Sequence, residues 1–341
     1  MTRPLSPTRI AGALAGLIGA ALVVLYLVLR LVPSNDYVLL PDTAHPVAPL
    51  VRVQGGHAAK GPGAIYFVDV FERRATLLEK YFPGILSGAT LVPASVIVPR
   101  GESDRQQRAA DLREMTTSQR VAAAVALRKL GYHVVARPDG VIVDAVEPGS
   151  HAVGKLQPTD RIVAVNGVPT LTVERLRAEL AKVRPGDIVN LDVRRGDKEL
   201  TVTIPTIADP LDPHRALVGF TPDQSADIRL PIKVQIDAGN VGGPSAGLAF
   251  ALQVMQALGR NVTHGYRVAA TGQMELDGAV APIGGVKQKT FGVRNAKADV
   301  FLVPAGDNAR EARRYAHGLR IIAVKSFQQA LHALATLPPK R

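Results

Sequence analysis

The chain contains no cysteine and no tryptophan, and aromatic residues make up 4% of its 341 residues. Without cysteine it can form neither a disulfide framework nor a thiolate metal site. Its eight histidines show neither H-x-x-x-H spacing nor a His–carboxylate cluster, so no metal site and no cofactor is expected. The P-loop pattern G-x-x-x-x-G-K-[ST] is also absent, which argues against an ATPase in this chain.

Positive charge predominates but is not concentrated. Lys plus Arg number 41 against 29 Asp plus Glu, a formal net charge of +12. The basic residues form no run and are not interleaved with aromatic residues, as nucleic-acid binding would favour. The sequence therefore predicts no nucleic-acid partner. A basic overall composition or an anionic membrane surface explains the excess more simply.

The stretch from Ile10 to Leu29 is twenty residues without a charge. As a helix it would span about 30 Å, the thickness of a bilayer core. We expect an uncleaved transmembrane helix over residues 10–31. A cleaved signal peptide is the alternative, but such a peptide normally has a shorter apolar region followed by a small-x-small cleavage site.

Charges flanking this helix predict its orientation. Arg3 and Arg9 precede it, whereas only Arg30 follows closely before the acidic Asp36 and Asp42. This asymmetry favours cytoplasmic residues 1–9 and an extracytoplasmic body, that is, a single-pass protein of the cell membrane.

A small-xxx-small pair within the apolar stretch bears on assembly. Gly12 and Gly16 are four residues apart, a spacing that lets two membrane helices approach closely. We therefore expect a homo-oligomer.

The segment around Ser245 carries the clearest chemical signal. An apolar run, Pro231–Ile236, is followed by a loop of small residues and then by a helical pattern that begins near Ser245. Ser245 can be interpreted as a helix cap, as the nucleophile of a Ser-His-Asp hydrolase because residues 243–247 fit G-x-S-x-G, or as the nucleophile of a Ser-Lys pair. The loop between strand and serine argues against the second interpretation, for which His264, His317 and His332 are the downstream candidates.

Two lysines, Lys287 and Lys289, could provide the base of a Ser-Lys pair. A lysine acts as a base only when it is neutral, which requires an apolar environment without a carboxylate partner. The surrounding sequence is poor in acidic residues. Side chains two residues apart on a helix point in nearly opposite directions, so at most one of the two can face Ser245.

Three motifs in this order, GPSAG (243–247), ATG (270–272) and APIGGVKQK (281–289), resemble the proteolytic domain of Lon proteases. The resemblance implies Ser245 as nucleophile, Lys289 as base and Thr271 as a hydrogen-bond partner of the lysine. Gly243, Pro244 and Ala246 would form the oxyanion and substrate loop. Gly242 departs from the acidic residue that Lon proteases commonly carry three positions before the serine, and the loop is more similar to that of membrane-anchored, PDZ-containing Lon-like proteases.

A second resemblance covers the segment 131–207. The series GVIV, PGSHA and L-x-x-x-D-x-I-x-x-V-N-G resembles a PDZ domain, which binds extended peptides by strand addition. The implied groove is Gly140, Val141, Ile142 and Val143. A PDZ domain that only packs on the protease and gates it is the alternative.

Together these expectations give a mixed α/β (α+β) Lon-type proteolytic domain with an inserted small PDZ β-sandwich or barrel and one N-terminal transmembrane helix. Residues 34–130 would supply the first part of the protease domain, including a helix from Arg105 to Leu130 with a break near Thr116, and residues 208–341 the part with the dyad. The expected function is an ATP-independent serine endopeptidase that cleaves unfolded or accessible polypeptides. The alternative is a non-proteolytic PDZ scaffold or chaperone of the membrane.

Overall fold

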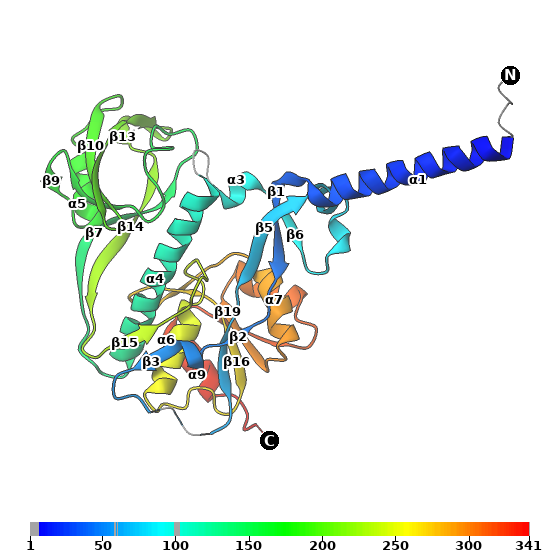
Figure 1. Ribbon diagram of the computed structural model, residues 1–341. Coiled ribbons are helices and arrows are strands. Elements are labelled where there is room, and N and C mark those ends of the chain that lie inside the picture. Colours follow the sequence, from blue (N-terminus) through cyan, green and yellow to red (C-terminus); the bar gives the residue numbers. More distant parts are fainter. Residues whose placement is uncertain (1–6, 58, 60, 99–102, 341) are drawn as a thin grey trace.

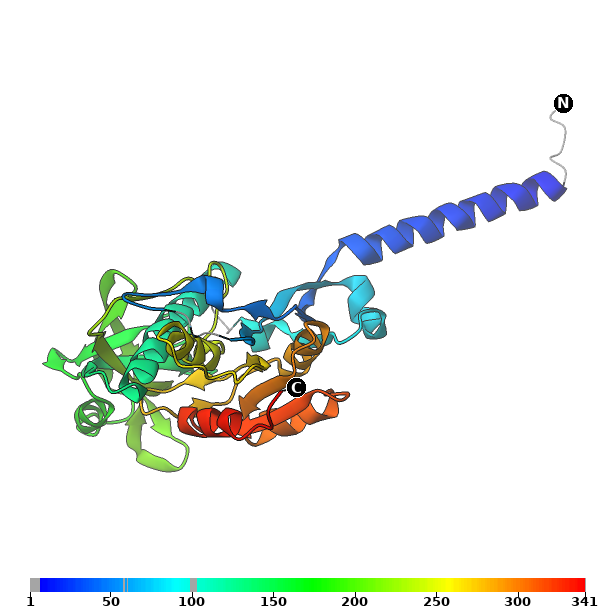
Figure 2. The same ribbon diagram turned by 90° about the horizontal axis from the view of Figure 1, so that it is seen from below.

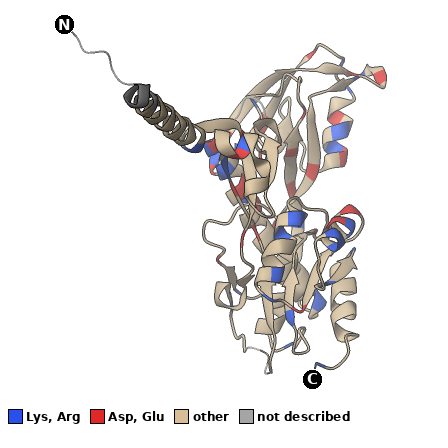
Figure 3. Cartoon of the chain, turned by 90° about the vertical axis from the view of Figure 1, so that its right-hand side faces the viewer, with Lys and Arg blue, Asp and Glu red and all other residues tan. Residues whose placement is uncertain are grey.

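Helix α1 (Pro7–Leu31) projects away from the rest of the computed structural model, which describes residues 7–57, 59, 61–98 and 103–340 (Figures 1 and 2). Its segment Leu14–Leu31 is long and apolar enough to cross a membrane, and none of it is buried. A signal sequence would have the same properties. In Figure 3 the helix is almost entirely without charged residues. Arg3 and the other residues before Pro7, on which the expected orientation partly rests, lie outside the described residues.

A five-stranded sheet forms the centre of the larger body, in the order β2-β4-β16-β19-β20. Its last four strands are parallel and β2 is antiparallel. The strands are β2 (His45–Pro46), β4 (Ala64–Phe67), β16 (Arg267–Ala270), β19 (Val300–Pro304) and β20 (Arg320–Val324).

Side chains of these strands alternate between two cores, as expected for a sheet covered on both faces. Val268 and Leu302 pack in one cluster with helices α4, α6 and α9. Ala269 and Phe301 pack in the other with helices α7 and α8. These helices are α4 (Asp104–Lys129), α6 (Gly247–Ala257), α7 (Val286–Asn295), α8 (Asp307–Arg314) and α9 (Phe327–Ala335).

Helix α4 packs in the core of the larger body, and it is continuous. It begins with a capping box formed by Ser103 and Gln106, a pairing that satisfies two backbone N–H groups at a helix start. The expected break near Thr116 is wrong, because the Thr116 hydroxyl donates to the Leu112 carbonyl one turn earlier and stays within the helix.

Smaller elements surround this body. Strands β1, β5 and β6 form an antiparallel sheet near α1, β3 pairs with β15, β12 with β13, and β17 with β18. Their bounds are β1 (Pro33–Pro41), β3 (Val51–Val53), β5 (Val70–Thr76), β6 (Thr90–Pro93), β12 (Ile207–Asp209), β13 (Asp212–Leu217), β15 (Val234–Ile236), β17 (Gln273–Met274) and β18 (Val280–Ala281). Short helices are α2 (Leu77–Tyr81), α3 (Ala94–Ile97) and the 3-10 turns η1 (Ala48–Leu50) and η2 (Pro83–Ile85).

The smaller body is a sheet in the order β11-β10-β8-β7-β14, with β9 beside β8 and one helix, α5. It has a core of its own that includes Val141, Ile162, Leu176 and Leu191. The elements are β7 (Val135–Val146), β8 (Arg161–Val165), β9 (Val168–Pro169), α5 (Val173–Leu180), β10 (Ile188–Arg195), β11 (Lys198–Pro205) and β14 (Phe220–Arg229).

The structure contradicts the expected peptide groove at Gly140, Val141, Ile142 and Val143. These residues belong to β7, which pairs with β8 on one side and with β14 on the other. A strand whose two edges are both paired has no free backbone groups to receive a peptide. The sequence analysis missed β14, which is the edge strand of this sheet.

Strands β7 and β14 form a long ribbon that runs from the smaller body into the larger one (Figure 1). Phe220 packs in the core of the smaller body, whereas Ile228 packs in the core of the larger one. Packing in the smaller body therefore continues beyond the boundary expected after residue 207.

Candidate active site

Ser245 lies between the loop that follows β15 and the start of α6. The N-cap of α6 is Ala246, and no side chain caps this helix. The Ser245 hydroxyl is therefore not a helix cap, which removes the simplest of the three interpretations of this residue. Its side chain is half-buried.

The structure brings Lys289 to Ser245. The Lys289 ammonium donates to Ser245 Oγ over 2.8 Å, although the two residues are 44 positions apart in the chain. Lys289 lies in the first half of α7, and its side chain is only 4% exposed. The glycine that caps α7, Gly285, has a φ of 68°, in the left-handed region that glycine adopts without strain.

Burial lowers the pKa of Lys289 from its ordinary value of 10.5 to about 8. Desolvation disfavours the ammonium and is the largest cause, while the carboxylates of Asp69 and Glu72 act in the opposite direction. These two acids come from the connection between β4 and β5 and from β5 itself. The sequence around Lys289 gives no sign of these two acids, which come from a distant segment, and neither forms an ion pair with Lys289 in the described structure.

Lys287 points elsewhere, as its spacing from Lys289 predicts. Its ammonium donates to the Ala89 carbonyl at 2.7 Å and to Thr90 Oγ1 at 3.3 Å. It also lies 5.8 Å from the centre of the Tyr315 ring. Lys287 thus holds the segment before β6 against α7, and it is a matched control for Lys289 in any test of the site.

Thr271 is close to the pair but has a different partner from the one expected. It is fully buried, and its hydroxyl donates to the backbone carbonyl of Ser245 at 3.1 Å rather than to Lys289. The same carbonyl accepts from the Gly272 N–H at 2.8 Å. Both contacts fix the backbone of the serine, so Thr271 orients Ser245 and not the lysine.

Among the three residues of the expected oxyanion loop, only Ala246 has an N–H group without an acceptor in the described structure. The Gly243 N–H donates to the Asp111 carbonyl at 2.8 Å, and Pro244 has no N–H. Within the part of the chain that the structure describes, the N–H groups of Ser245 and Ala246 have no protein acceptor. These two adjacent donors, next to Oγ, are the candidates for binding a developing oxyanion.

Helix α4 holds the serine loop in place, a role that the sequence analysis did not assign to it. The Ser118 hydroxyl donates to the Pro244 carbonyl at 2.8 Å, and the Asp111 carbonyl receives the Gly243 N–H. A Cβ atom at Gly242 would lie 2.6 Å from the Asp111 Cβ. The close approach of α4 therefore explains why this chain has glycine at the position where Lon proteases commonly have an acid.

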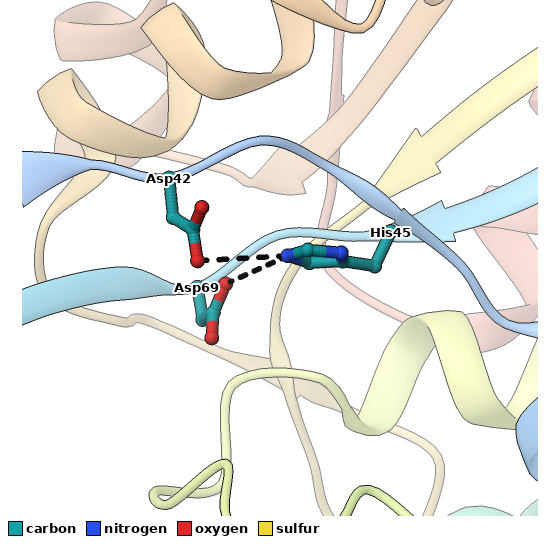
Figure 4. A group of neighbouring side chains, drawn as sticks. All are labelled: Asp42, His45 and Asp69. Atoms are coloured by element: carbon teal, nitrogen blue, oxygen red, sulfur yellow. Dashed lines mark ion pairs between the residues drawn. The ribbon is translucent and has the colours of Figure 1, made fainter.

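Histidine does not contribute to the serine site. His264, His317 and His332 are all exposed, and none of them is hydrogen-bonded to Ser245 in the described structure. A Ser-His pair is therefore not formed. One expectation about histidine is wrong, however, because Asp42, His45 and Asp69 do form a His–carboxylate cluster (Figure 4).

A cavity of about 640 Å³ lies between the β7–β14 ribbon and α4 and reaches Pro244. Carboxylates on its wall include Glu114 and Glu275. Burial, helped by neighbouring Asp111 and Asp144, raises the pKa of Glu114 to about 7. The cavity thus joins the smaller body to the loop that carries the serine, and its wall is acidic.

Comparisons with known proteins identify both bodies. Residues 214–336 match the Lon protease (S16) C-terminal proteolytic domain, and residues 128–206 match the PDZ domain. Lon protease 2 of Bacillus subtilis is 34% identical over 123 residues, which are 36% of this chain and 21% of that protein. Lon protease 1 of Sorangium cellulosum is 31% identical over 139 residues, 36% of this chain and 17% of that protein.

Among solved structures, the PDZ domain of an SdrC-like protein from Listeria monocytogenes is 25% identical, with a TM-score of 0.23. The match covers 25% of this chain and 87% of the Listeria chain. The chain spans only about a fifth of the length of the two Lon proteases. The larger body thus contains a Lon-type proteolytic domain, the smaller one is a PDZ domain, and the matches support a serine peptidase.

The buried ammonium makes a testable prediction about stability. Because the pKa of Lys289 is lower in the folded chain, its burial destabilises the fold fully below about pH 8, and this cost disappears as the pH rises through 10.5. A shift of this size corresponds to about 3 kcal/mol at most. Lys289→Met should therefore raise the free energy of unfolding at pH 7 by about 1–3 kcal/mol, and the gain should shrink towards pH 10.

Urea unfolding of the full chain in detergent micelles, followed by circular dichroism, measures this difference. Lys287→Met is the control and should show no gain, because it removes hydrogen bonds to Ala89 and Thr90 without relieving a buried charge. A gain that is absent at pH 7, or that grows with pH, would contradict the prediction.

Proposed function

We propose that the chain is a membrane-anchored, ATP-independent serine endopeptidase that cleaves unfolded or accessible polypeptides with a Ser245–Lys289 dyad. The observation that carries the proposal is the 2.8 Å contact between the Lys289 ammonium and Ser245 Oγ, formed by a lysine that is 4% exposed. A structural lysine would be expected at the surface or paired with a carboxylate, and the described structure gives Lys289 no such ion pair.

Chemistry begins when Lys289 is neutral. Its Nζ accepts the hydroxyl proton of Ser245 while Oγ attacks the scissile carbonyl, and the tetrahedral intermediate forms. Lys289 then returns the proton to the leaving amine, and the peptide bond breaks to give an acyl-enzyme. A water molecule, deprotonated by the same lysine, hydrolyses the ester and restores Ser245.

The negative charge of the tetrahedral intermediate would be held by the N–H groups of Ser245 and Ala246. Both lie at the start of α6, where the helix dipole adds to the positive potential. Removing one such donor typically slows catalysis by about 100- to 1000-fold. Contacts from Thr271 and Ser118 to neighbouring carbonyls keep the two donors oriented.

The proposal also states that the enzyme is anchored in the membrane and does not require ATP. Helix α1 supports a single N-terminal anchor, and the charges that flank it favour a catalytic body outside the cytoplasm. No P-loop accompanies the proteolytic domain in this sequence. Substrates would then be polypeptides that are already unfolded or exposed. The Gly12–Gly16 pair supports association of anchors into a homo-oligomer, which the particle mass in detergent tests directly.

The PDZ domain is proposed to capture peptide, at a different strand from the one first expected. The edge strand beside α5 is β14, and Gln224 on this strand binds α5 through the Val173 N–H at 3.2 Å. An extended peptide could add to the outer edge of β14 by backbone hydrogen bonds. Because β14 also lines the cavity that reaches Pro244, captured chain would be delivered towards the serine.

Substitutions at the dyad test the proposed activity. The full chain, recovered from alkaline-washed membranes and solubilised in detergent, should cleave casein without ATP. Ser245→Ala and Lys289→Ala should each reduce the rate by at least about a thousandfold, because each removes one half of the nucleophile–base pair. Lys287→Ala is the matched control and should retain activity.

Failure to recover the protein in washed membranes would refute the anchor. Equal cleavage by wild type and both dyad variants would refute the mechanism. A folded wild type that neither cleaves casein nor reacts with a serine-directed probe would instead favour the alternative of a non-proteolytic PDZ scaffold.

The lowered pKa of Lys289 predicts the pH dependence of cleavage. Only the neutral amine accepts a proton, so kcat/KM should rise about tenfold per pH unit below the pKa and level off above about 8. Glu72→Gln should shift this profile to lower pH, because the Glu72 carboxylate favours the ammonium. A profile that is flat from pH 6 to pH 9, or that shifts upward in this variant, would exclude Lys289 as the base.

Hydrogen exchange locates peptide capture. In the Ser245→Ala chain, a short peptide with an apolar C-terminal residue and a free carboxylate should slow amide exchange in residues 220–229. The amidated peptide is the control for a carboxylate requirement. Protection elsewhere in the PDZ domain, or none at saturating peptide, would contradict strand addition at β14.

A further inference from the structure

Asp42, His45 and Asp69 converge at the place where three strands end or begin (Figure 4). Asp42 directly follows β1, His45 is the first residue of β2, and Asp69 lies between β4 and β5. One donor atom from each lies within 4.8 Å of the other two. None of these residues is hydrogen-bonded to Ser245 or Lys289 in the described structure, although the charge of the Asp69 carboxylate acts on Lys289.

The spacing of these atoms is that of ligands around a shared ion rather than of a hydrogen-bonded triad. His45 Nε2 lies 3.5 Å from Asp42 Oδ2 and 3.9 Å from Asp69 Oδ1, too far for hydrogen bonds. Ligands that are about 2.0–2.1 Å from a tetrahedral zinc ion are separated by about 3.3 Å. Small side-chain rotations would bring the three atoms to this separation.

Asp69 provides an independent sign of a missing partner. Its Oδ1 is buried and has no hydrogen-bond donor within the described residues. A buried carboxylate oxygen without a donor is costly, and such atoms are rare in folded proteins. The atom faces His45 Nε2 (Figure 4), so a cation placed between them would satisfy it.

The ligand atoms indicate which kind of ion the cluster would bind. One imidazole nitrogen and two carboxylate oxygens suit zinc and similar borderline metals, whereas magnesium and calcium prefer oxygen ligands alone. The side chains of His45 and Asp42 are 46% and 40% exposed. Ions can therefore enter from solvent, and water can complete the coordination.

The cluster also lies behind the helix that carries Lys289. A Cβ atom at Gly292 of α7 would lie 1.9 Å from the Asp42 carbonyl oxygen, and one at Gly285 would lie 2.6 Å from Val70 Cγ2. Helix α7 is thus packed directly against the Asp42 loop and against the residue that follows Asp69. An ion bound to both Asp42 and Asp69 would therefore hold together the two segments against which α7 packs.

We propose that Asp42, His45 and Asp69 form a binding site for a zinc-like divalent metal ion, which joins the strand ends that support α7. The ion does not touch Ser245 or the substrate. Asp42, His45 and Asp69 are therefore positioning residues that act on Lys289 through the packing of α7, and Asp69 acts on it also through its charge. The site would exist whether or not the chain is a protease.

Metal binding is measured on the full Ser245→Ala chain in detergent, which removes any dependence on proteolysis. Isothermal titration with zinc should give one ion per chain, and cobalt should give visible absorption bands of a coordinated ion. His45→Ala and Asp69→Asn should weaken zinc binding by at least tenfold. His332→Ala, at an exposed position on α9, is the matched control and should bind normally.

Hydrogen exchange supplies the second readout. Zinc should slow amide exchange in residues 286–295, and it should not do so in the His45→Ala chain. Equal zinc binding in all variants, or no stoichiometric binding by a folded chain, would overturn the site and leave an ordinary Asp–His ion pair. Binding without an effect on α7 would overturn the link to Lys289.

Discussion

The site depends on a lysine side chain that is held away from water beside a serine. Burial makes the ammonium of Lys289 costly and brings its pKa to about 8, where a useful fraction of neutral amine exists near physiological pH. Asp69 and Glu72 limit this effect. Without them the amine would be neutral at lower pH but would be a weaker base. Under the proposed mechanism the two carboxylates therefore balance the fraction of neutral lysine against its strength as a base.

Close backbone packing is what keeps the lysine and the serine together. On one side, Gly285 and Gly292 let α7 lie against the ends of β1 and β5. On the other, Gly242 lets α4 approach the serine loop, where Ser118 and the Asp111 carbonyl hold it. The segments that pack against α7 and against the serine loop therefore lie before position 130, whereas Ser245 and Lys289 lie after position 240.

Sequence reasoning located the reactive groups because they lie in ordered motifs of distinctive composition. The order of the motifs pointed to the Ser245 loop, helical geometry allowed at most one of Lys287 and Lys289 to face it, and the choice of Lys289 came from the resemblance to Lon proteases. The partner of Thr271, the pairing of β14 with β7, and the cluster of Asp42, His45 and Asp69 could not be found in this way. Each depends on contacts between segments far apart in the chain, and single polar residues such as Asp69 carry no pattern that predicts their neighbours.

The β7–β14 ribbon gives the two bodies a physical connection. Phe220 packs in the PDZ core and Ile228 in the core of the larger body, so the ribbon is anchored at both ends. Its face lines the cavity whose wall includes Pro244, one residue before the serine. A peptide added along β14 would stiffen the ribbon and lie beside this cavity. Capture and cleavage would then share one structural element, so that no separate gate is required.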